Sequence, residues 1–169
     1  ALYEAFGFER SDISALFVVG FGSSMVFGTF IGSLADKFGR RRFAMLYVLL
    51  YIGSCLTKHF KSYPSLMLGR LLGGISTSLL FSVFESWLVC EHNKRNFDPG
   101  WISGTFSLAF FGNSIVAIVS GLAAQFASDL VPFQSSGPTF HYGGYTAPFD
   151  MAVLMLAAVA GSTIEEANL

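Results

Sequence analysis

The 169 residues include 53% hydrophobic and only 12% charged residues, and their net charge is −1. Soluble domains carry about 25% charged residues, so this chain has too few polar side chains to cover a water-soluble globule. It also lacks a basic tract long enough for a nucleic-acid partner. We therefore expect an all-α polytopic membrane protein whose surface contacts the lipid bilayer.

Five apolar segments approach the ~20 residues that a membrane-spanning helix needs. They cover residues 13–34, 43–59, 65–89, 101–126 and 149–164. The second segment is short unless it extends through Lys58, whose long side chain can reach the membrane surface. The third contains two charges, Arg70 and Glu85. Residues 127–147 are rich in Gly, Ser, Pro and aromatic residues and predict an exposed loop.

Basic residues are distributed unequally between the two sides of these segments. One side holds six, namely Lys37, Arg40, Arg41, Arg42, Lys94 and Arg95. The other side holds three, namely Arg10, Lys58 and Lys61. Basic loops face the cytoplasm, so loops 35–42 and 90–100 are predicted to be cytoplasmic and 127–147 to lie outside. We expect the protein to lie in the plasma membrane.

A Gly-x-x-x-Asp-x-x-Gly-Arg-Arg pattern begins at Gly32 and joins the first two segments. Gly32 permits a neighbouring helix to approach closely, and Gly39 permits a tight turn because it has no Cβ. Asp36 can interact with a helix end, while Arg40 and Arg41 can bind a carboxylate through paired N–H groups. A loop that only set the topology would leave the spacing of the glycines and the aspartate unexplained.

Small residues recur at every fourth position before this pattern, at Gly20, Ser24, Gly28 and Gly32. Residues four apart share one face of a helix, and small residues let membrane helices pack closely. Two interpretations are open. The stripe either packs against a neighbouring helix of the same bundle or contacts a partner that moves.

Arg70 lies in an apolar segment, where a charge costs at least ~2.5 kcal/mol. Helical periodicity places Arg70, Gly74, Thr77, Phe81 and Glu85 on one face. Arg70 and Glu85 are about 22 Å apart at 1.5 Å per residue, so each needs its own partner. Arg70 either attracts an anionic solute or supports proton coupling, or it forms a structural ion pair with a helix outside this chain.

Glu85 lies near the predicted cytoplasmic end of its segment. It is expected to pair with Arg40 or Arg41, and a role in proton coupling or substrate gating is the alternative. Glu91 lies at the same membrane face and competes for the same arginines.

The pattern that begins at Gly32 is similar to the signature between the second and third helices of major facilitator transporters, and Arg70-x-x-x-Gly74 resembles a second signature of that superfamily. The resemblance implies twelve helices in two halves. Residues 1–169 would then form a partial N-terminal half with the second to sixth helices, and the C-terminal half would be missing. It also implies that Gly32, Asp36, Gly39, Arg40 and Arg41 hold the two halves together in the outward-open state.

More local stretches resemble the eukaryotic molybdate-anion transporter family. They are Phe-Gly-Ser-Ser-Met at 21–25, Ser-Cys-Leu-Thr-Lys-His at 54–59, residues 81–95 and Ala-Pro-Phe-Asp at 147–150. The resemblance implies uptake of molybdate, a tetrahedral dianion, by alternating access. It identifies no substrate contacts.

Chemistry nominates contacts for such an anion, because a dianion in a cavity needs positive charge and hydrogen-bond donors. Arg70 supplies the charge. Neutral donors could come from Ser76, Thr77, Ser107 and Asn113. For each of these, the alternative is a hydroxyl bonded to its own backbone or, for Asn113, a packed side chain.

No paired carboxylates or Cys/His arrangement lies at matching depth, so we expect no enzyme. His59, His92 and His141 lack metal-ligand spacing and are expected at the surface or the membrane interface, without a metal or cofactor. Cys55 and Cys90 are expected to be free thiols. Two other functions are open because fold does not decide cargo: transport of a sugar or other organic solute, and a receptor that binds without transport.

Overall fold

The computed structural model describes residues 2–165 and, within these, all side chains except those of 40, 41 and 162–165. The helices are α1 (Leu2–Ala5), α2 (Arg10–Phe38), α3 (Arg40–Thr57), α4 (Tyr63–Lys94), α5 (Trp101–Leu130), the 3₁₀ helix η1 (Gly144–Thr146) and α6 (Ala147–Glu165). Two short strands, β1 (Gln134–Ser135) and β2 (His141–Tyr142), pair antiparallel.

The helices confirm the prediction of an all-α polytopic membrane protein. Helices α2, α4 and α5 and residues Gly144–Gly161 are long and apolar enough to cross a membrane, while the apolar part of α3, Arg42–Thr57, is shorter. A bilayer core forces such segments into helices, because only a helix satisfies its backbone N–H and C=O groups internally. Helix α3 ends at Thr57, where the Lys58 N–H bonds the Cys55 carbonyl three residues back.

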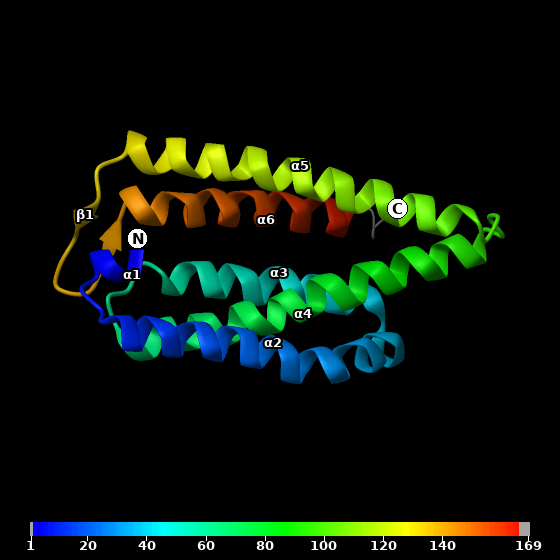
Figure 1. The fold of residues 1–169 in the computed structure, drawn as a ribbon, viewed down its shortest axis with the longest axis horizontal. Coiled ribbons are helices and arrows are strands. Elements are labelled where there is room, and N and C mark those ends of the chain that lie inside the picture. The colour runs from blue at the N-terminus through cyan, green and yellow to red at the C-terminus, as the bar shows by residue number, and fades with distance from the viewer. Residues whose placement is uncertain (1, 166–169) are drawn as a thin grey trace.

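Helix α4 is central to the lower group in Figure 1, because it packs against both α2 and α3. Helix α6 contacts α3 and extends alongside α5, which forms the opposite edge of the molecule. No described residue of α5 is buried. Helix α5 therefore presents an apolar surface that suits contact with lipid.

The small-residue stripe of α2 packs mainly against α4. The Ser78 hydroxyl donates to the Ser24 carbonyl oxygen at 2.6 Å, and a Cβ at Gly28 would lie 3.5 Å from Ser78 Oγ. A Cβ at Gly20 would likewise touch α4. Gly32 differs, since no described atom of another helix lies within 4 Å of a Cβ built there. Packing within the same half therefore accounts for three of the four positions.

Two hydrophobic clusters stabilise opposite ends of the bundle. One unites Ile31, Ala35, Ala44, Leu79 and Val83 from α2, α3 and α4. The other unites Tyr3, Phe6, Leu16 and Leu66. The second cluster anchors the short helix α1 over the end of the bundle, which brings Tyr3 close to the cavity described below.

The two basic connections lie at one end of the bundle, on the right of Figure 1, and α1 and the hairpin lie at the other. Gly39 makes the first connection, between α2 and α3, with φ +99°. A positive φ of this size favours glycine, because glycine has no Cβ that would clash with the backbone. Residues 95–100 make the second connection. The structure thus places loops 35–42 and 90–100 at the same end, as expected for loops that follow the first and third spanning segments.

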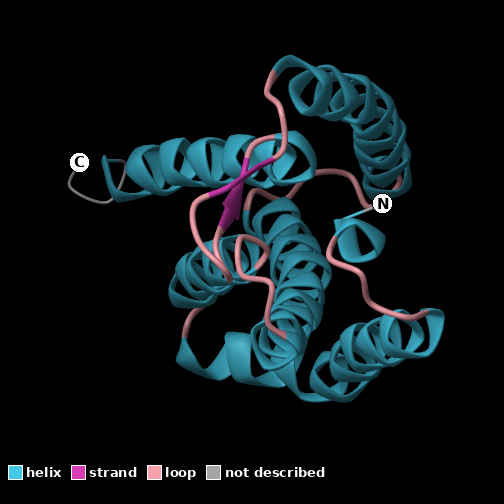
Figure 2. Ribbon diagram, turned by 90° about the vertical axis from the view of Figure 1, so that its left-hand side faces the viewer, coloured by secondary structure: helices cyan, strands magenta, loops and turns pink. Residues whose placement is uncertain are grey.

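The stretch 127–147, expected to be an exposed loop, is partly folded and buried. Its first four residues continue α5, and its strands lie across the end of the bundle that faces the viewer in Figure 2. The His141 N–H donates to the His59 carbonyl at 2.8 Å, and the Lys61 N–H to the Thr139 carbonyl at 2.7 Å. Farther along, the Gly144 N–H donates to the Val131 carbonyl at 2.7 Å and the Thr146 N–H to the Gly143 carbonyl at 3.0 Å, so the burial of Gly143, Gly144 and Thr146 is tolerated. The expectation of exposure is wrong for these three residues.

Candidate functional site

A cavity of about 380 Å³ lies between α2, α3, α4 and α6. Its wall combines aromatic side chains, small polar residues and two basic side chains, Lys58 and Arg70. No Asp or Glu is among its lining residues. The cavity therefore has a positive character that no acidic residue of its wall offsets.

Arg70 enters the cavity from α4, beside Gly20 of α2. Its guanidinium carbon lies 4.2 Å from the centre of the Phe17 ring and 5.0 Å from that of Tyr3. Such cation–π contacts stabilise the charge by about 0.5–2 kcal/mol. The Nε–H is nevertheless buried without a hydrogen-bond partner among the described residues. An unpaired buried donor costs about 1–3 kcal/mol, so Arg70 retains an unsatisfied capacity to bind an acceptor.

Lys58 is the second cation at the cavity, and the sequence did not indicate this position. It was expected at the membrane surface, but its side chain is 5% exposed. Its Nζ donates to the Tyr3 hydroxyl at 3.1 Å and lies 5.6 Å from the centre of the Tyr3 ring. A Cβ at Gly69 would lie 3.3 Å from this Nζ and would collide with the Thr57 hydroxyl. Gly69 thus leaves room for Lys58 beside α4, next to Arg70.

Tyr3 contacts both cations from helix α1. Burial raises the pKa of Tyr3, and the positive charge of Arg70 opposes this shift without cancelling it. The phenol therefore stays protonated at neutral pH. Because its oxygen accepts from Lys58, its own O–H remains available as a donor.

Gly74, the glycine of the Arg70-x-x-x-Gly74 pattern, is required by helix packing. A Cβ there would collide with the Gly20 carbonyl oxygen and the Ser23 hydroxyl of α2. Helices α2 and α4 therefore meet backbone to backbone at this point. That close contact sets the separation of the helices on which Phe17 and Arg70 lie.

Thr77 lines the cavity, but its hydroxyl donates to the Gly73 carbonyl at 2.9 Å. The Ser76 hydroxyl likewise donates to the Leu72 carbonyl at 2.8 Å, and Ser76 is absent from the cavity wall. Both show the alternative that the sequence left open, a hydroxyl bonded to its own helix. Among the predicted donors, only Thr77 therefore reaches the cavity.

Ser107, Asn113 and Glu85 are not brought to the cavity. Ser107 and Asn113 are exposed on α5, which packs against α6 and η1 and has no wall in the cavity. Glu85 is exposed farther along α4. A helical wheel places Glu85 on the same face of α4 as Arg70. It does not show how far the cavity extends along the helix, and the cavity ends before it reaches Glu85.

The motif that begins at Gly32 lies at the other end of the bundle from the hairpin. Asp36 and Gly39 are exposed there. The side chains of Arg40 and Arg41 lie outside the described residues, and so does their expected pairing with Glu85. Glu91 was expected to compete for them, but it bonds the Arg95 Nε at 2.8 Å instead. Arg95 follows Glu91 by one helical turn, which makes this local pair geometrically easy.

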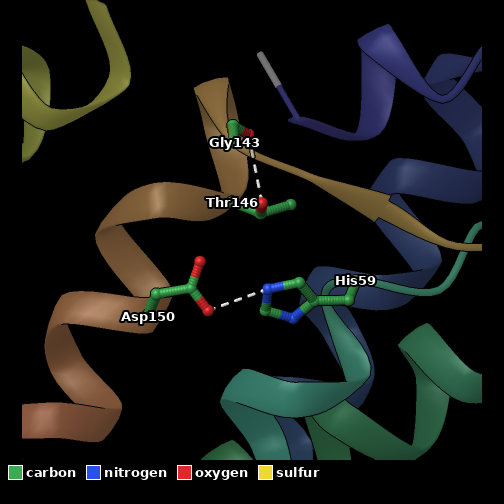
Figure 3. Close-up of polar contacts among 4 residues, drawn as sticks. All are labelled: His59, Gly143, Thr146 and Asp150. Carbon is green, nitrogen blue, oxygen red and sulfur yellow. Dashed lines mark hydrogen bonds and ion pairs between the residues drawn. The ribbon is translucent and has the colours of Figure 1, made fainter. Parts of the chain in front are cut away.

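A His–Asp pair links α6 to the end of α3 (Figure 3). His59 Nε2 lies 2.9 Å from Asp150 Oδ1, and the imidazole stacks on Phe140 with 5.8 Å between ring centres. The Thr146 hydroxyl donates to the Gly143 carbonyl at 3.0 Å and secures the turn that leads into α6. This pair holds α6, one wall of the cavity, against α3.

The histidines were expected at the surface or at the membrane interface, and a surface position is wrong for two of the three. His59 and His92 are 6% and 7% exposed, because their imidazoles bond Asp150 and the Asp98 carbonyl, respectively. Cys55 is a buried and Cys90 an exposed free thiol. Among the side chains that the structure describes, no group of three or more His, Cys, Asp or Glu residues is placed to hold a metal ion.

Comparison with known proteins identifies the superfamily. A major facilitator family model, described as sugar transporters with 12 transmembrane helices, matches residues 1–166. The chain belongs to the major facilitator superfamily. It is 38% identical over 160 residues to a molybdate-anion transporter of Takifugu rubripes and 36% identical over 166 residues to one of Danio rerio. A Xenopus laevis molybdate-anion transporter is 36% identical over 139 residues.

These matches cover 94%, 98% and 82% of the chain, respectively. They cover only 31%, 32% and 31% of the relatives. The chain therefore spans about a third of the length of these major facilitator proteins. The helices and the cavity described above belong to that third.

Proposed function

We propose that this chain forms part of a secondary transporter, not an enzyme, that moves molybdate or a similar oxyanion by alternating access. The observation that carries the proposal is the buried Arg70 Nε–H, which lacks a partner among the described residues and lies in a cavity that also holds the buried Lys58 and has no lining carboxylate. An uncompensated charge in a low-dielectric site is costly. A bound anion would remove that cost. The names of the relatives, molybdate-anion transporters, support the same cargo.

A sugar is the second candidate cargo, because the matching family is described as sugar transporters. Volume does not separate the two, since pockets of about 300–1,000 Å³ accommodate small organic ligands and this cavity is about 380 Å³. Charge does separate them. A neutral sugar would leave both Arg70 and Lys58 without a counter-charge.

The proposed transporter includes a second helix half outside these residues, and α2–α6 correspond to its second to sixth helices. The length of the relatives supports this arrangement. Gly32 supports it as well, because the space beside it is open while Gly20 and Gly28 are covered by α4. In this arrangement Gly32, Asp36, Gly39, Arg40 and Arg41 contact the second half at the cytoplasmic face. The proposed location is the plasma membrane, with loops 35–42 and 90–100 inside.

Uptake of labelled molybdate, in cells that express the chain with the sequence that flanks it in its transcript, tests this proposal. Tungstate and sulfate are expected to compete, and sugars are not. Arg70→Gln should lower uptake at least about ten-fold, the effect of about 1.4 kcal/mol, at equal surface expression. Arg95→Gln removes an exposed arginine and should leave uptake unchanged.

Each contrary outcome points to a different conclusion. Absence of saturable molybdate uptake, together with saturable sugar uptake, would assign the sugar function. Binding of molybdate without flux would assign a receptor. Normal uptake by Arg70→Gln would show that Arg70 does not bind the transported anion.

A further inference from the structure

We propose that Lys58, held in place by Tyr3, is the second cationic contact of the anion site and makes the site prefer dianions to monoanions. This inference rests on the proposed function and assigns its substrate class by charge. Lys58 is 5% exposed, and it comes from the end of α3, whereas Arg70 comes from α4.

The two cations meet at one aromatic ring. The guanidinium of Arg70 and the ammonium of Lys58 lie 5.0 Å and 5.6 Å from the centre of the Tyr3 ring. Both also line a second cavity of about 450 Å³ beside α1, in addition to the 380 Å³ cavity. The pair thus lies where the two cavities adjoin, so an anion that passes from one to the other would meet both charges.

A purely structural role leaves the position of Lys58 unexplained. A lysine at a helix end can extend its ammonium to water, yet this one is buried beside another cation. No described carboxylate forms an ion pair with it: Asp150 bonds His59, and Glu4, which lines the second cavity, is exposed. The Tyr3 hydroxyl is its hydrogen-bond partner, and a hydroxyl supplies no counter-charge. A bound dianion would supply the charge that both cations lack.

Coulomb's law converts this arrangement into a selectivity. The attraction between one cation and an anion is proportional to the anion's charge. Loss of the Lys58 charge therefore reduces the binding free energy of a dianion twice as much as that of a monoanion of equal shape. A five-fold loss for a monoanion implies about a 25-fold loss for the dianion, because the factor is squared.

Inhibition of molybdate uptake by tungstate and by perrhenate measures this selectivity, since both are tetrahedral oxyanions with charges of −2 and −1. In the complete protein, Lys58→Gln should raise the inhibition constants of both anions. The factor for tungstate should be the square of the factor for perrhenate. Lys58→Arg keeps the charge and should keep the ratio of the two inhibition constants within about two-fold. Lys61→Gln removes an exposed lysine three residues away and should leave both constants unchanged.

Tyr3→Phe provides a test that does not alter any charge. It removes the oxygen that accepts from Lys58 and keeps the ring beneath both cations. We expect the tungstate-to-perrhenate selectivity to fall at least about three-fold, because the ammonium is no longer fixed. A residue that only stabilised the fold would change surface expression and leave the selectivity unchanged.

The outcomes separate this inference from the proposed function. If the wild type takes up molybdate and Lys58→Gln raises the inhibition constants of tungstate and perrhenate by the same factor, the role of Lys58 is overturned and the proposed function stands. Absence of oxyanion uptake by the wild type would overturn both. If Lys58→Gln does not reach the membrane, Tyr3→Phe and Lys58→Arg decide, and unchanged selectivity in Tyr3→Phe or lost selectivity in Lys58→Arg would overturn the inference.

Discussion

Gly74→Ala tests the backbone contact between α2 and α4 that positions the cavity wall. The added Cβ would collide with the Gly20 carbonyl oxygen and the Ser23 hydroxyl, and it would lie 3.0 Å from the Ser24 nitrogen. Two of these three atoms belong to the α2 backbone, so no side-chain rotation removes the overlap, and α2 must shift. Overpacking of this kind costs about 1–3 kcal/mol, which opposes the ~1 kcal/mol that alanine gains over glycine in a helix.

Gly28→Ala is the matched control on the same pair of helices. Its new Cβ would lie 3.5 Å from Ser78 Oγ, an ordinary contact, so only the helix-propensity gain applies. The two variants should therefore differ by about 1–3 kcal/mol. At about 2–4 °C per kcal/mol for 150–250 residues, the apparent melting temperature of Gly74→Ala in detergent should be about 2–12 °C below that of Gly28→Ala. Equal melting temperatures would refute the backbone contact.

Two further predictions concern α6 and the membrane orientation. Asp150→Ala removes the partner of His59 Nε2 and should lower the free energy of unfolding by about 1–3 kcal/mol, because a buried ring nitrogen becomes unpaired. The control Asp129→Ala on α5 should lower the melting temperature in detergent far less. Equal effects of the two variants would contradict the link between α3 and α6. Cys90 is exposed near the 90–100 loop and Cys55 is buried. A membrane-impermeant maleimide, located by peptide mass spectrometry, should therefore label Cys90 only after the cells are permeabilised and Cys55 only after denaturation. Labelling of Cys90 in intact cells would reverse the proposed orientation.

The spanning helices could be predicted because a bilayer imposes a local rule. Each segment must satisfy its own backbone and be about 20 apolar residues long, and both properties can be read along the chain. The ends were less predictable. Helices α2 and α4 continue beyond their apolar segments to Phe38 and Lys94, because hydrogen bonding within a helix does not stop where hydropathy falls.

The sequence by itself identified the membrane class, the shared side of the basic loops, the Gly32 motif and the unusual charge of Arg70. Each of these depends on composition or on spacing within one segment. Only the tertiary structure decided which residues join Arg70. Lys58 and Tyr3 are 55 positions apart, and their contact requires α1 to fold over the bundle and Gly69 to leave space on α4. Only the tertiary structure likewise showed that Ser107 and Asn113 lie outside the cavity. Helical periodicity shows which side chains share a face, but not which helix that face meets.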